Sequence, residues 1–170
     1  MLDLAGIVND SIVDGPGIRM TVFAQGCPHH CQGCHNPETW TFGCGTPMEE
    51  ERILEIVRTN PLCRGVTFSG GEPFAQAEGF AKLAKLLKAK GYEVASYSGY
   101  TFEQLINGTD AQKELLRSID VLIDGPFVLA EKSLEVTFRG SRNQRIIHVP
   151  KSLAAGEAIC ITKGRWAGEY

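Results

Sequence analysis

Short apolar runs alternate with longer amphipathic segments along this chain. The runs expected to form strands lie at 7–8 (a short edge strand), 19–25, 65–68, 92–97, 121–123, 135–138 and 145–149. The run at 121–123 has no polar interruption, which is typical of a strand buried on both faces. A last apolar run lies at 158–162, and for the polar end beyond it we expect no regular structure.

Helical spacing fills most of the gaps between these runs. Apolar residues at i, i+3, i+4 and i+7 from Phe80 onward predict a helix over 75–90, with lysines on its opposite face. A Thr-Pro pair and the acidic residues after it predict the start of an earlier helix over 46–59. Two shorter helices are expected, one capped by Thr101 and one over 111–118.

Strands that alternate with helices predict βαβ units and a parallel sheet. The chain has 170 residues, which leaves room for about five or six units, whereas a complete eight-fold barrel takes about 250 residues. We therefore expect an α/β fold, an incomplete (β/α) barrel with a curved, mostly parallel sheet. We expect a single domain over 1–170, with its core at about 7–149 and a C-terminal extension at 150–170.

The composition is that of an ordinary globular protein, with 43 % hydrophobic residues, 22 % charged residues and a net charge of −3. The charges form no long block of one sign, which argues against binding to nucleic acid or to a membrane surface. The N-terminal residues lack the features of a signal peptide, and no apolar run approaches the roughly 20 residues of a membrane span. We expect a cytoplasmic protein, in which clustered cysteines serve metal binding or catalysis more often than disulfides.

Cys27, Cys31 and Cys34 lie on one short loop after the strand at 19–25, with the spacing C-x-x-x-C-x-x-C. Thiolates so close together repel one another unless a cation or a cluster shares their charge. Iron–sulfur clusters are held by cysteine thiolates, commonly four. Three thiolates would leave one iron open, and an open metal position is typical of a catalytic site.

Zinc is the alternative metal, with His29, His30 or His35 as the fourth ligand. Zinc sites usually arrange their ligands as two C-x-x-C-type pairs, so the spacing favours a cluster. The default expectation for His29 and His30 is exposure to solvent. Three further cysteines are isolated in the sequence and are expected to be small buried apolar residues: Cys44, Cys63 and Cys160.

A second motif, Ser69-Gly70-Gly71-Glu72-Pro73, lies between a predicted strand and a predicted helix. Most Gly-Gly pairs are turns, but two residues without Cβ also let a ligand approach the main chain closely. Main-chain carbonyls and the Glu72 carboxylate would then suit an ammonium group. Because loops after parallel strands meet at one rim, this loop, the cysteine loop and the loops at 98–99 and 124–125 should lie together.

The two motifs, in this order and on these elements, resemble those of radical S-adenosylmethionine enzymes. Asp14-Gly15-Pro16-Gly17-Ile18-Arg19, before the first confident strand, and Cys34-His35-Asn36-Pro37 with Trp40, after the cluster loop, resemble the glycyl-radical-enzyme activases, which are oxidoreductases. The resemblance spans about 7–149. Taken alone, Trp40 is expected to be a core or interface aromatic residue, and Arg19 a structural or substrate-side cation.

The resemblance implies one 4Fe-4S cluster per chain, ligated by Cys27, Cys31 and Cys34, with S-adenosylmethionine chelating the open iron. One electron would cleave the sulfonium, and the 5′-deoxyadenosyl radical would take hydrogen from a backbone glycine of the partner. It implies no catalytic residue beyond cluster and cofactor. By position, the expected cofactor contacts are Gly70, Gly71 and Glu72 to the ammonium group, and the main chain of Gly33, Cys34 and His35 along the adenine.

Within this family, the short chain and the element Arg139-Gly140-Ser141-Arg142-Asn143-Gln144-Arg145-Ile146 resemble the members that act on anaerobic ribonucleoside-triphosphate reductase. The large subunit of that reductase is the expected partner, together with a low-potential electron donor such as flavodoxin. Two alternatives stay open. One is the activase of another glycyl radical enzyme such as pyruvate formate-lyase, and the other is a non-catalytic zinc-binding interaction module.

The chain departs from related sequences at two places. Gly33 stands where many radical S-adenosylmethionine enzymes have an aromatic residue, and Asp124-Gly125-Pro126 stands where the pyruvate formate-lyase activase has Asp-x-Lys. Two roles are open to Asp124, binding the ribose or carboxylate end of the cofactor or capping a turn. Cys44 alone lies where other activases insert a cysteine-rich segment, so no auxiliary cluster is expected.

Overall fold

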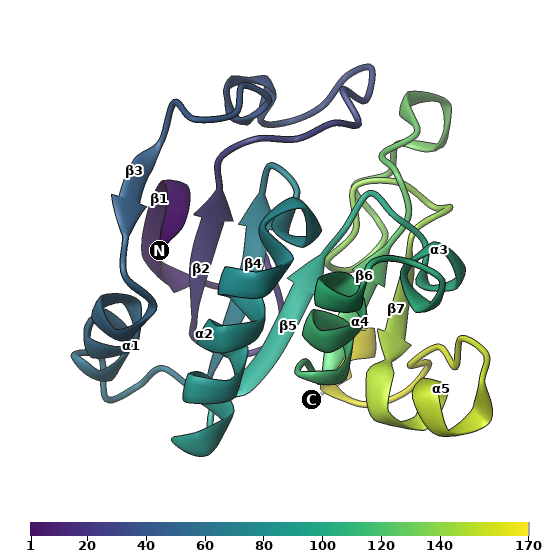
Figure 1. Ribbon diagram of the computed structural model, residues 1–170. Coiled ribbons are helices and arrows are strands. Elements are labelled where there is room, and N and C mark those ends of the chain that lie inside the picture. Colours follow the sequence, from purple (N-terminus) through teal and green to yellow (C-terminus); the bar gives the residue numbers. More distant parts are fainter. Residues whose placement is uncertain (170) are drawn as a thin grey trace.

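One seven-stranded sheet organises the computed structural model, which describes residues 1–169 (Figure 1). Its strands are β1 (Leu2–Ser11), β2 (Arg19–Ala24), β3 (Thr46–Met48), β4 (Gly65–Gly70), β5 (Glu93–Tyr97), β6 (Val121–Asp124) and β7 (Arg145–His148). They lie in the order β3-β1-β2-β4-β5-β6-β7. The central strands β2, β4, β5 and β6 pair in parallel, whereas β1, β3 and β7 pair antiparallel with their neighbours.

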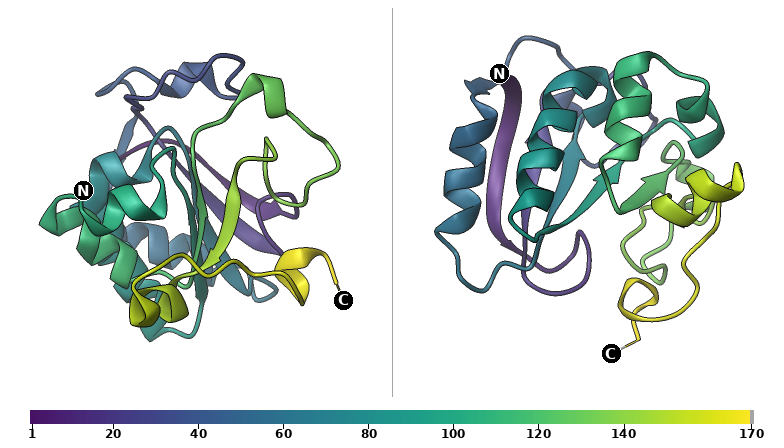
Figure 2. Two further views of the ribbon diagram at one scale, coloured as in Figure 1. Left: turned by 90° about the vertical axis from the view of Figure 1, so that its right-hand side faces the viewer. Right: turned by 60° about the horizontal axis from the view of Figure 1, so that its bottom comes forward.

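Helices cover one face of this sheet. They are α1 (Glu50–Arg58), α2 (Ala77–Ala89), α3 (Phe102–Ile106), α4 (Asp110–Arg117) and α5 (Val149–Ala155), with short 3-10 turns at Pro37–Thr39, Pro73–Gln76, Leu129–Glu131 and Arg165–Ala167. Figure 2 shows α1, α2 and α4 on one side of the sheet and the C-terminal segment on the other. Across residues 1–169, no helix combines the length and apolar character that crossing a membrane requires.

The main hydrophobic core lies between the helices and the sheet. Met20, Val22 and Ala24 of β2 are buried in it, as the period of two of a strand requires. Apolar residues of α2 are buried against the sheet as their spacing predicted, namely Phe80, Leu83, Ala84 and Leu87. The helices therefore fix one face of the parallel strands and leave the strand ends free to carry a site.

The opposite face of the sheet carries polar side chains beneath the C-terminal segment. Arg19 is fully buried, and its guanidinium donates to Thr67 Oγ1 at 3.0 Å and to Glu93 Oε1 at 2.8 Å. Its Cζ atom lies 5.1 Å from the centre of the Trp166 ring, which also packs edge-on against Phe138. Arg19 is thus a structural cation, and Trp166 closes the side of the sheet that a complete barrel would enclose.

The predicted fold is confirmed in part. The fold is mixed α/β with parallel central strands, and β3 and β7 form its two edges. The parallel pairs β2·β4, β4·β5 and β5·β6 correspond to three crossovers, fewer than the five or six units expected. The predicted division into a core and a C-terminal extension stays a prediction.

Two predictions for the N-terminal half are wrong. The helix expected over 46–59 begins only at Glu50, because Thr46–Met48 pairs with β1 as an edge strand, where a proline is tolerated. The short edge strand expected at 7–8 is the ten-residue strand β1, which lies inside the sheet because β3 covers its outer side. Both errors arise from pairing between segments far apart in sequence.

One predicted strand in the C-terminal half is absent, and one helix there was not predicted. The segment 135–138 forms no strand, and β7 is the strand that follows β6 in the sheet. The run at 158–162 makes a single bridge, between Ile147 and Cys160. Helix α5 was not expected, since its N-cap is His148, whose Nδ1 accepts from the main-chain N–H of Lys151, and histidine is an uncommon cap.

Candidate functional site

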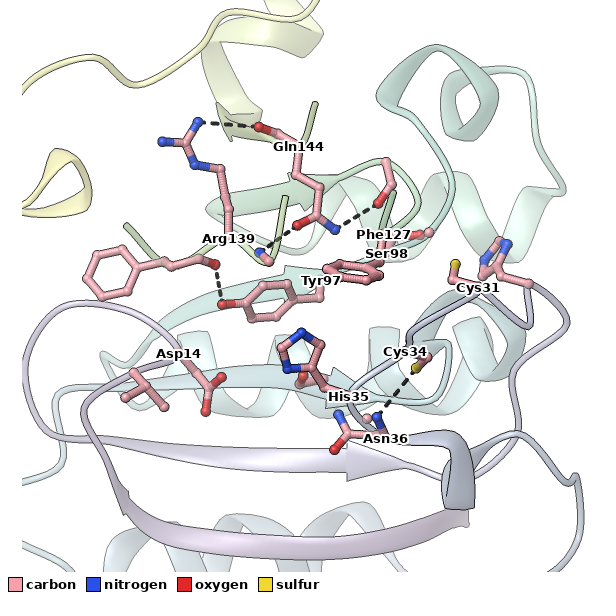
Figure 3. A pocket seen from close by; sticks show the side chains of 18 of the residues that line it. Asp14, Cys31, Cys34, His35, Asn36, Tyr97, Ser98, Phe127, Arg139 and Gln144 are labelled. Atoms are coloured by element: carbon pink, nitrogen blue, oxygen red, sulfur yellow. Dashed lines mark hydrogen bonds between the residues drawn. The ribbon is translucent and has the colours of Figure 1, made fainter. Parts of the chain in front are cut away.

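Loops that follow β2, β4, β5 and β6 line one cavity of about 650 Å³ (Figure 3). The predicted meeting of four loops at one rim is therefore confirmed. The lining includes Cys27, Cys31, Cys34 and His35 from the first loop, Gly70 and Gly71 from the second, Ser98 and Gly99 from the third, and Gly125 from the fourth. Gly33, Glu72 and Asp124, which the sequence also indicated, do not line it.

The three thiols share this cavity but differ in exposure. Cys27 is buried, whereas Cys31 and Cys34 are half-buried. Burial raises the pKa of the Cys27 thiol, so a thiolate there requires a positive partner. The main chain holds the loop in place: the Cys27 N–H donates to the Trp40 carbonyl at 3.1 Å, and Cys34 Sγ accepts from the N–H of Asn36 at 3.4 Å.

The spacing of the thiols fits a cluster better than a single ion. Tetrahedral zinc with Zn–S bonds of about 2.3 Å would bring its sulfurs within about 3.8 Å of one another. Over residues 1–169, only one set of three potential metal-ligating atoms from His, Cys, Asp or Glu lies within 4.8 Å of one another. It belongs to Glu49, Glu50 and Glu51, outside the cysteine loop. The three cysteine sulfurs do not all lie within 4.8 Å of one another, so they are not gathered around one tetrahedral ion.

Glu72 is fully buried and joins three loops instead of facing the cavity. Its carboxylate accepts from the Phe74 N–H at 3.0 Å, the Gly99 N–H at 2.7 Å and the Ser98 hydroxyl at 3.0 Å. His29 Nε2 lies 2.6 Å from the same carboxylate. The predicted exposure of His29 is therefore wrong, since its side chain ties the cysteine loop to the loops after β4 and β5. These contacts occupy both oxygens of the Glu72 carboxylate, so it is not free to bind a ligand.

The two glycines are required by the neighbouring main chain. The Gly71 N–H donates to the Ala24 carbonyl at 2.8 Å, and a Cβ on Gly71 would lie 2.3 Å from the Gly26 carbonyl oxygen. Gly70 has a φ of +89°, and a Cβ there would lie 2.7 Å from the Ala24 nitrogen. The start of the cysteine loop and the Gly-Gly loop are thus fastened to each other, while both glycines still face the cavity.

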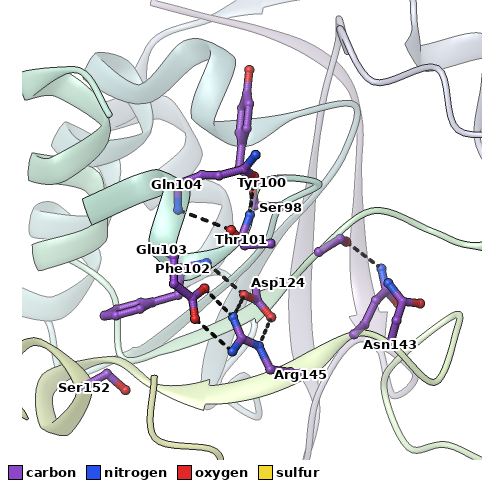
Figure 4. A network of polar contacts seen from close by, with 12 residues as sticks. Ser98, Tyr100, Thr101, Phe102, Glu103, Gln104, Asp124, Asn143, Arg145 and Ser152 are labelled. Atoms are coloured by element: carbon purple, nitrogen blue, oxygen red, sulfur yellow. Dashed lines mark hydrogen bonds and ion pairs between the residues drawn. The ribbon is translucent and has the colours of Figure 1, made fainter. Parts of the chain in front are cut away.

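Asp124 is engaged by Arg145 (Figure 4). Its carboxylate accepts from Arg145 Nη2 at 2.6 Å and Nε at 3.0 Å, and from the N–H of Phe102 at 2.8 Å. Arg145 also binds Glu103 at 2.7 Å and holds the pKa of that carboxyl below its usual range. Of the two roles left open for Asp124, these contacts favour the structural one, since they join β6, β7 and the start of α3.

The segment between β6 and β7 forms the far wall of the cavity. The Gln144 side chain accepts from the Gly140 N–H at 2.8 Å and donates to the Gly125 carbonyl at 3.1 Å. The Tyr97 hydroxyl donates to the Phe138 carbonyl at 2.6 Å, and burial raises the pKa of that hydroxyl. The sequence indicated the element at 139–146 but not its place in this wall, because the strand predicted at 135–138 does not form.

The structure explains why residue 33 is a glycine and not a larger residue. A Cβ at Gly33 would lie 2.8 Å from Leu129 Cδ1, and the φ of Gly33 is +76°. Leu129 of the far wall therefore occupies the place next to the third cysteine. The His35 ring packs edge-on against Phe127 of the same wall, and the two ring centroids lie 5.1 Å apart.

The other cysteines take no part in the cavity. Cys63 is buried, as predicted, whereas Cys44 and Cys160 are exposed, contrary to prediction. Both exposed residues lie outside the helices and strands, and Cys160 makes a single bridge to Ile147.

Known proteins resemble this chain over most of its length. The family described as a 4Fe-4S single cluster domain matches residues 13–147. The anaerobic ribonucleoside-triphosphate reductase-activating protein of Vibrio cholerae is 37 % identical over 145 residues, which cover 81 % of this chain and 91 % of that protein. The protein of that name from Escherichia coli K12 is 35 % identical over 146 residues, or 81 % of this chain and 93 % of that protein.

Two further similarities are more limited. The pyruvate formate-lyase-activating enzyme of Clostridium pasteurianum is 40 % identical over 108 residues, which cover 58 % of this chain and 45 % of that enzyme. The crystal structure of QueE from Escherichia coli aligns with a TM-score of 0.51 at 17 % identity, covering 72 % of this chain and 69 % of that one. At that identity the second similarity concerns the fold alone.

Proposed function

Since the chain belongs to the family of anaerobic ribonucleoside-triphosphate reductase-activating proteins and carries its 4Fe-4S single cluster domain, we propose that it installs the glycyl radical on such a reductase. The family membership agrees with the resemblance inferred from the cysteine and Gly-Gly-Glu-Pro motifs. The observation that carries the proposal is the meeting of three unpaired thiols with the Gly70–Gly71 loop in one cavity.

The cluster is assigned to Cys27, Cys31 and Cys34. The three thiols are free, line one cavity and are not gathered around a single ion, and the matched family is a 4Fe-4S single cluster domain, so we assign them as three ligands of a 4Fe-4S cluster. When bound, the cluster would supply the electron for reductive cleavage of S-adenosylmethionine, which starts the removal of hydrogen from a glycine of the partner. Cys27, Cys31 and Cys34 would hold the cluster at the wall of this cavity.

The remaining contacts to S-adenosylmethionine are assigned by what faces the cavity. The main chain at Gly70 and Gly71 receives the ammonium group, because no side chain there blocks its approach. The main chain at Cys34 and His35 lies along the adenine. Glu72 and Gly33 do not contact the cofactor directly. Glu72 positions the loops that carry these contacts, and Gly33 leaves room for Leu129 beside the third cysteine.

The partner is the large subunit of anaerobic ribonucleoside-triphosphate reductase, and a low-potential protein such as flavodoxin supplies the electron. The target follows from relatives that this chain covers over more than nine-tenths of their length. A pyruvate formate-lyase is the second candidate target, because an activating enzyme of that lyase is 40 % identical to part of this chain. That match covers 45 % of the relative, so it carries less weight.

One anaerobic experiment tests the proposal. The protein is reconstituted with iron and sulfide, reduced, mixed with S-adenosylmethionine and the reductase large subunit, and examined by EPR. A glycyl-radical doublet together with 5′-deoxyadenosine is the expected result. Deoxyadenosine without a doublet would assign the chemistry but reject the reductase, and the same mixture with pyruvate formate-lyase would then test the second candidate. A colourless protein with stoichiometric zinc would reject the proposal.

Ligand substitutions make the first prediction. Cys27→Ala, Cys31→Ala and Cys34→Ala should each abolish cleavage of S-adenosylmethionine, since an incomplete ligand set does not hold the cluster. Cys44→Ala and Cys160→Ala are the matched controls, since both residues are exposed and outside the cavity. Deoxyadenosine formation at wild-type rate in any of the first three variants would contradict the ligand assignment.

A further inference from the structure

Exposed apolar side chains gather at the mouth of the cavity that holds the three thiols. Over residues 1–169, the large apolar side chains that are exposed belong to Met1, Val8, Ile12, Val13, Phe42, Leu62, Leu129 and Leu134. Three of them line this cavity: Ile12 and Val13 in the loop between β1 and β2, and Leu134 in the segment between β6 and β7. Their exposed fractions are 71 %, 70 % and 92 %. Together they form an apolar rim, and apolar surface that gathers beside a cavity is typical of a binding site.

The main chain next to Leu134 has free hydrogen-bond donors. Val136 and Thr137 are residue types that favour strands, yet the strand predicted at 135–138 does not form. The main-chain N–H groups of Leu134, Val136 and Thr137 donate to no atom of residues 1–169. All three residues line the cavity. This stretch therefore offers main-chain donors, and residue types suited to extended structure, to a second chain that lies beside the cavity.

The same wall carries positive charge that no acidic group neutralises. Lys132 and Arg139 line the cavity, and neither forms an ion pair within residues 1–169. Arg139 is half-buried and donates only to the main-chain carbonyls of Thr137 and Gln144, both at 3.3 Å. Asp14 is the one carboxylate among the lining residues, and it forms no ion pair either. A partner segment that carries a negative charge therefore fits this wall better than a basic one.

We propose that the glycine-bearing segment of the partner docks as an extended chain along residues 134–137. Its main-chain carbonyls accept from the free N–H groups there, as in the addition of a strand to a sheet edge. A glycine has no side chain, so apolar residues beside it in the partner supply the contact with Ile12, Val13 and Leu134, and an acidic residue lies toward Lys132. The inference rests on the proposed function, because it names the surface through which the partner's glycine reaches the thiol cavity.

Substitutions on both segments test the apolar rim. Ile12→Ser and Leu134→Ser should each weaken binding of the reductase large subunit by about tenfold, because each removes an apolar contact of the interface. The measurement is fluorescence anisotropy of the labelled subunit, titrated with the reconstituted protein in the presence of S-adenosylmethionine. Lys132→Glu should also weaken binding, and this effect should shrink at high salt. Leu62→Ser is the matched control and should bind as the wild type does, since Leu62 is 61 % exposed and lies outside the cavity.

Hydrogen exchange followed by mass spectrometry tests the main-chain contact. A fragment that contains residues 134–137 should exchange fast in the free reconstituted protein, because three of its amides have no acceptor. Exchange there should slow by about tenfold or more when the reductase is bound. Equal affinities of the wild type, Ile12→Ser and Leu134→Ser would overturn the inference, and so would exchange at 134–137 that the reductase does not slow. A wild-type protein that gives no glycyl-radical doublet with the reductase would instead overturn the proposed function.

Discussion

At the scale of single residues, the main change concerns Glu72. Its motif indicated a carboxylate that receives a ligand, yet the side chain is fully buried, accepts bonds from Ser98 and Gly99, and lies 2.6 Å from His29 Nε2. A buried carboxyl group with this many donors is a fixed structural acceptor. The motif is therefore recognisable from sequence, but the role of each of its members depends on partners up to 43 residues away.

Removing this carboxylate should be costly. Glu72→Ala leaves buried donors from three loops without an acceptor, and we expect it to lower the free energy of unfolding of the apo protein by roughly 3–5 kcal/mol. Urea denaturation under reducing conditions measures this. Glu157→Ala, at an exposed position, is the control and should change the free energy by less than about 0.5 kcal/mol. Equal stability of the two variants would show that the network is dispensable.

Tyr97 gives the protein an alkaline sensitivity. Burial raises its pKa above the usual value, so between about pH 10 and the folded-state pKa only the unfolded chain ionises there. The contribution of the neutral hydroxyl is fully present below about pH 10 and is lost as the pH rises further. Tyr97→Phe should flatten the fall in stability between about pH 9.5 and 11, while costing about 1 kcal/mol at pH 8 for the lost bond to Phe138. Urea midpoints that decline equally in both proteins would rule this out.

At the scale of elements, the site depends on how β2 and β4 end. Their parallel register sets Ala24 beside Gly70, and the main chain then continues as two loops bonded to each other. The order of strands and helices along the centre of the chain was predictable, because apolar runs and helical spacing are local signals. The pairing of β1 with β3 was not, because Thr46–Met48 is a strand only through bonds to residues more than 40 positions earlier.

A methyl group added where the loops after β2 and β4 contact each other should weaken cluster binding. Gly71→Ala would bring a Cβ within 2.3 Å of the Gly26 carbonyl oxygen, so the two loops must separate. We expect a destabilisation of about 2 kcal/mol and a several-fold loss of iron retained after reconstitution and desalting. Gly6→Ala is the control, because no atom lies within 4 Å of its added Cβ. Full iron content in Gly71→Ala would show that the loops tolerate separation.

At the scale of the whole molecule, the sheet remains open between β3 and β7, and different segments cover its two faces. Helices cover one face, whereas the other is closed near Arg19 by Trp166 and Phe138 (Figure 2). The sequence indicated that the chain is too short for a complete barrel. It did not indicate what replaces the missing part, because a lone tryptophan in a polar tail has no periodic pattern to read.

This closure makes a further prediction. Trp166 is 5 % exposed, so Trp166→Ala should lower the free energy of unfolding by about 3–5 kcal/mol through lost packing. It also removes the ring that lies over the buried Arg19 guanidinium. Thermal and urea denaturation of the apo protein measure the change, and Trp166→Phe should cost much less. A loss below about 1 kcal/mol in Trp166→Ala would show that the C-terminal segment does not support the fold.

The position of the cysteine loop outside the main core has a consequence for damage and recovery. Cys27, Cys31 and Cys34 are absent from the apolar core that holds the sheet to its helices, and the loop keeps its shape through bonds to Glu72, Trp40 and the Gly-Gly turn. We therefore expect the polypeptide to stay folded when oxygen destroys the cluster. Iron, sulfide and a thiol reductant should then be enough to restore the protein, without synthesis of a new chain.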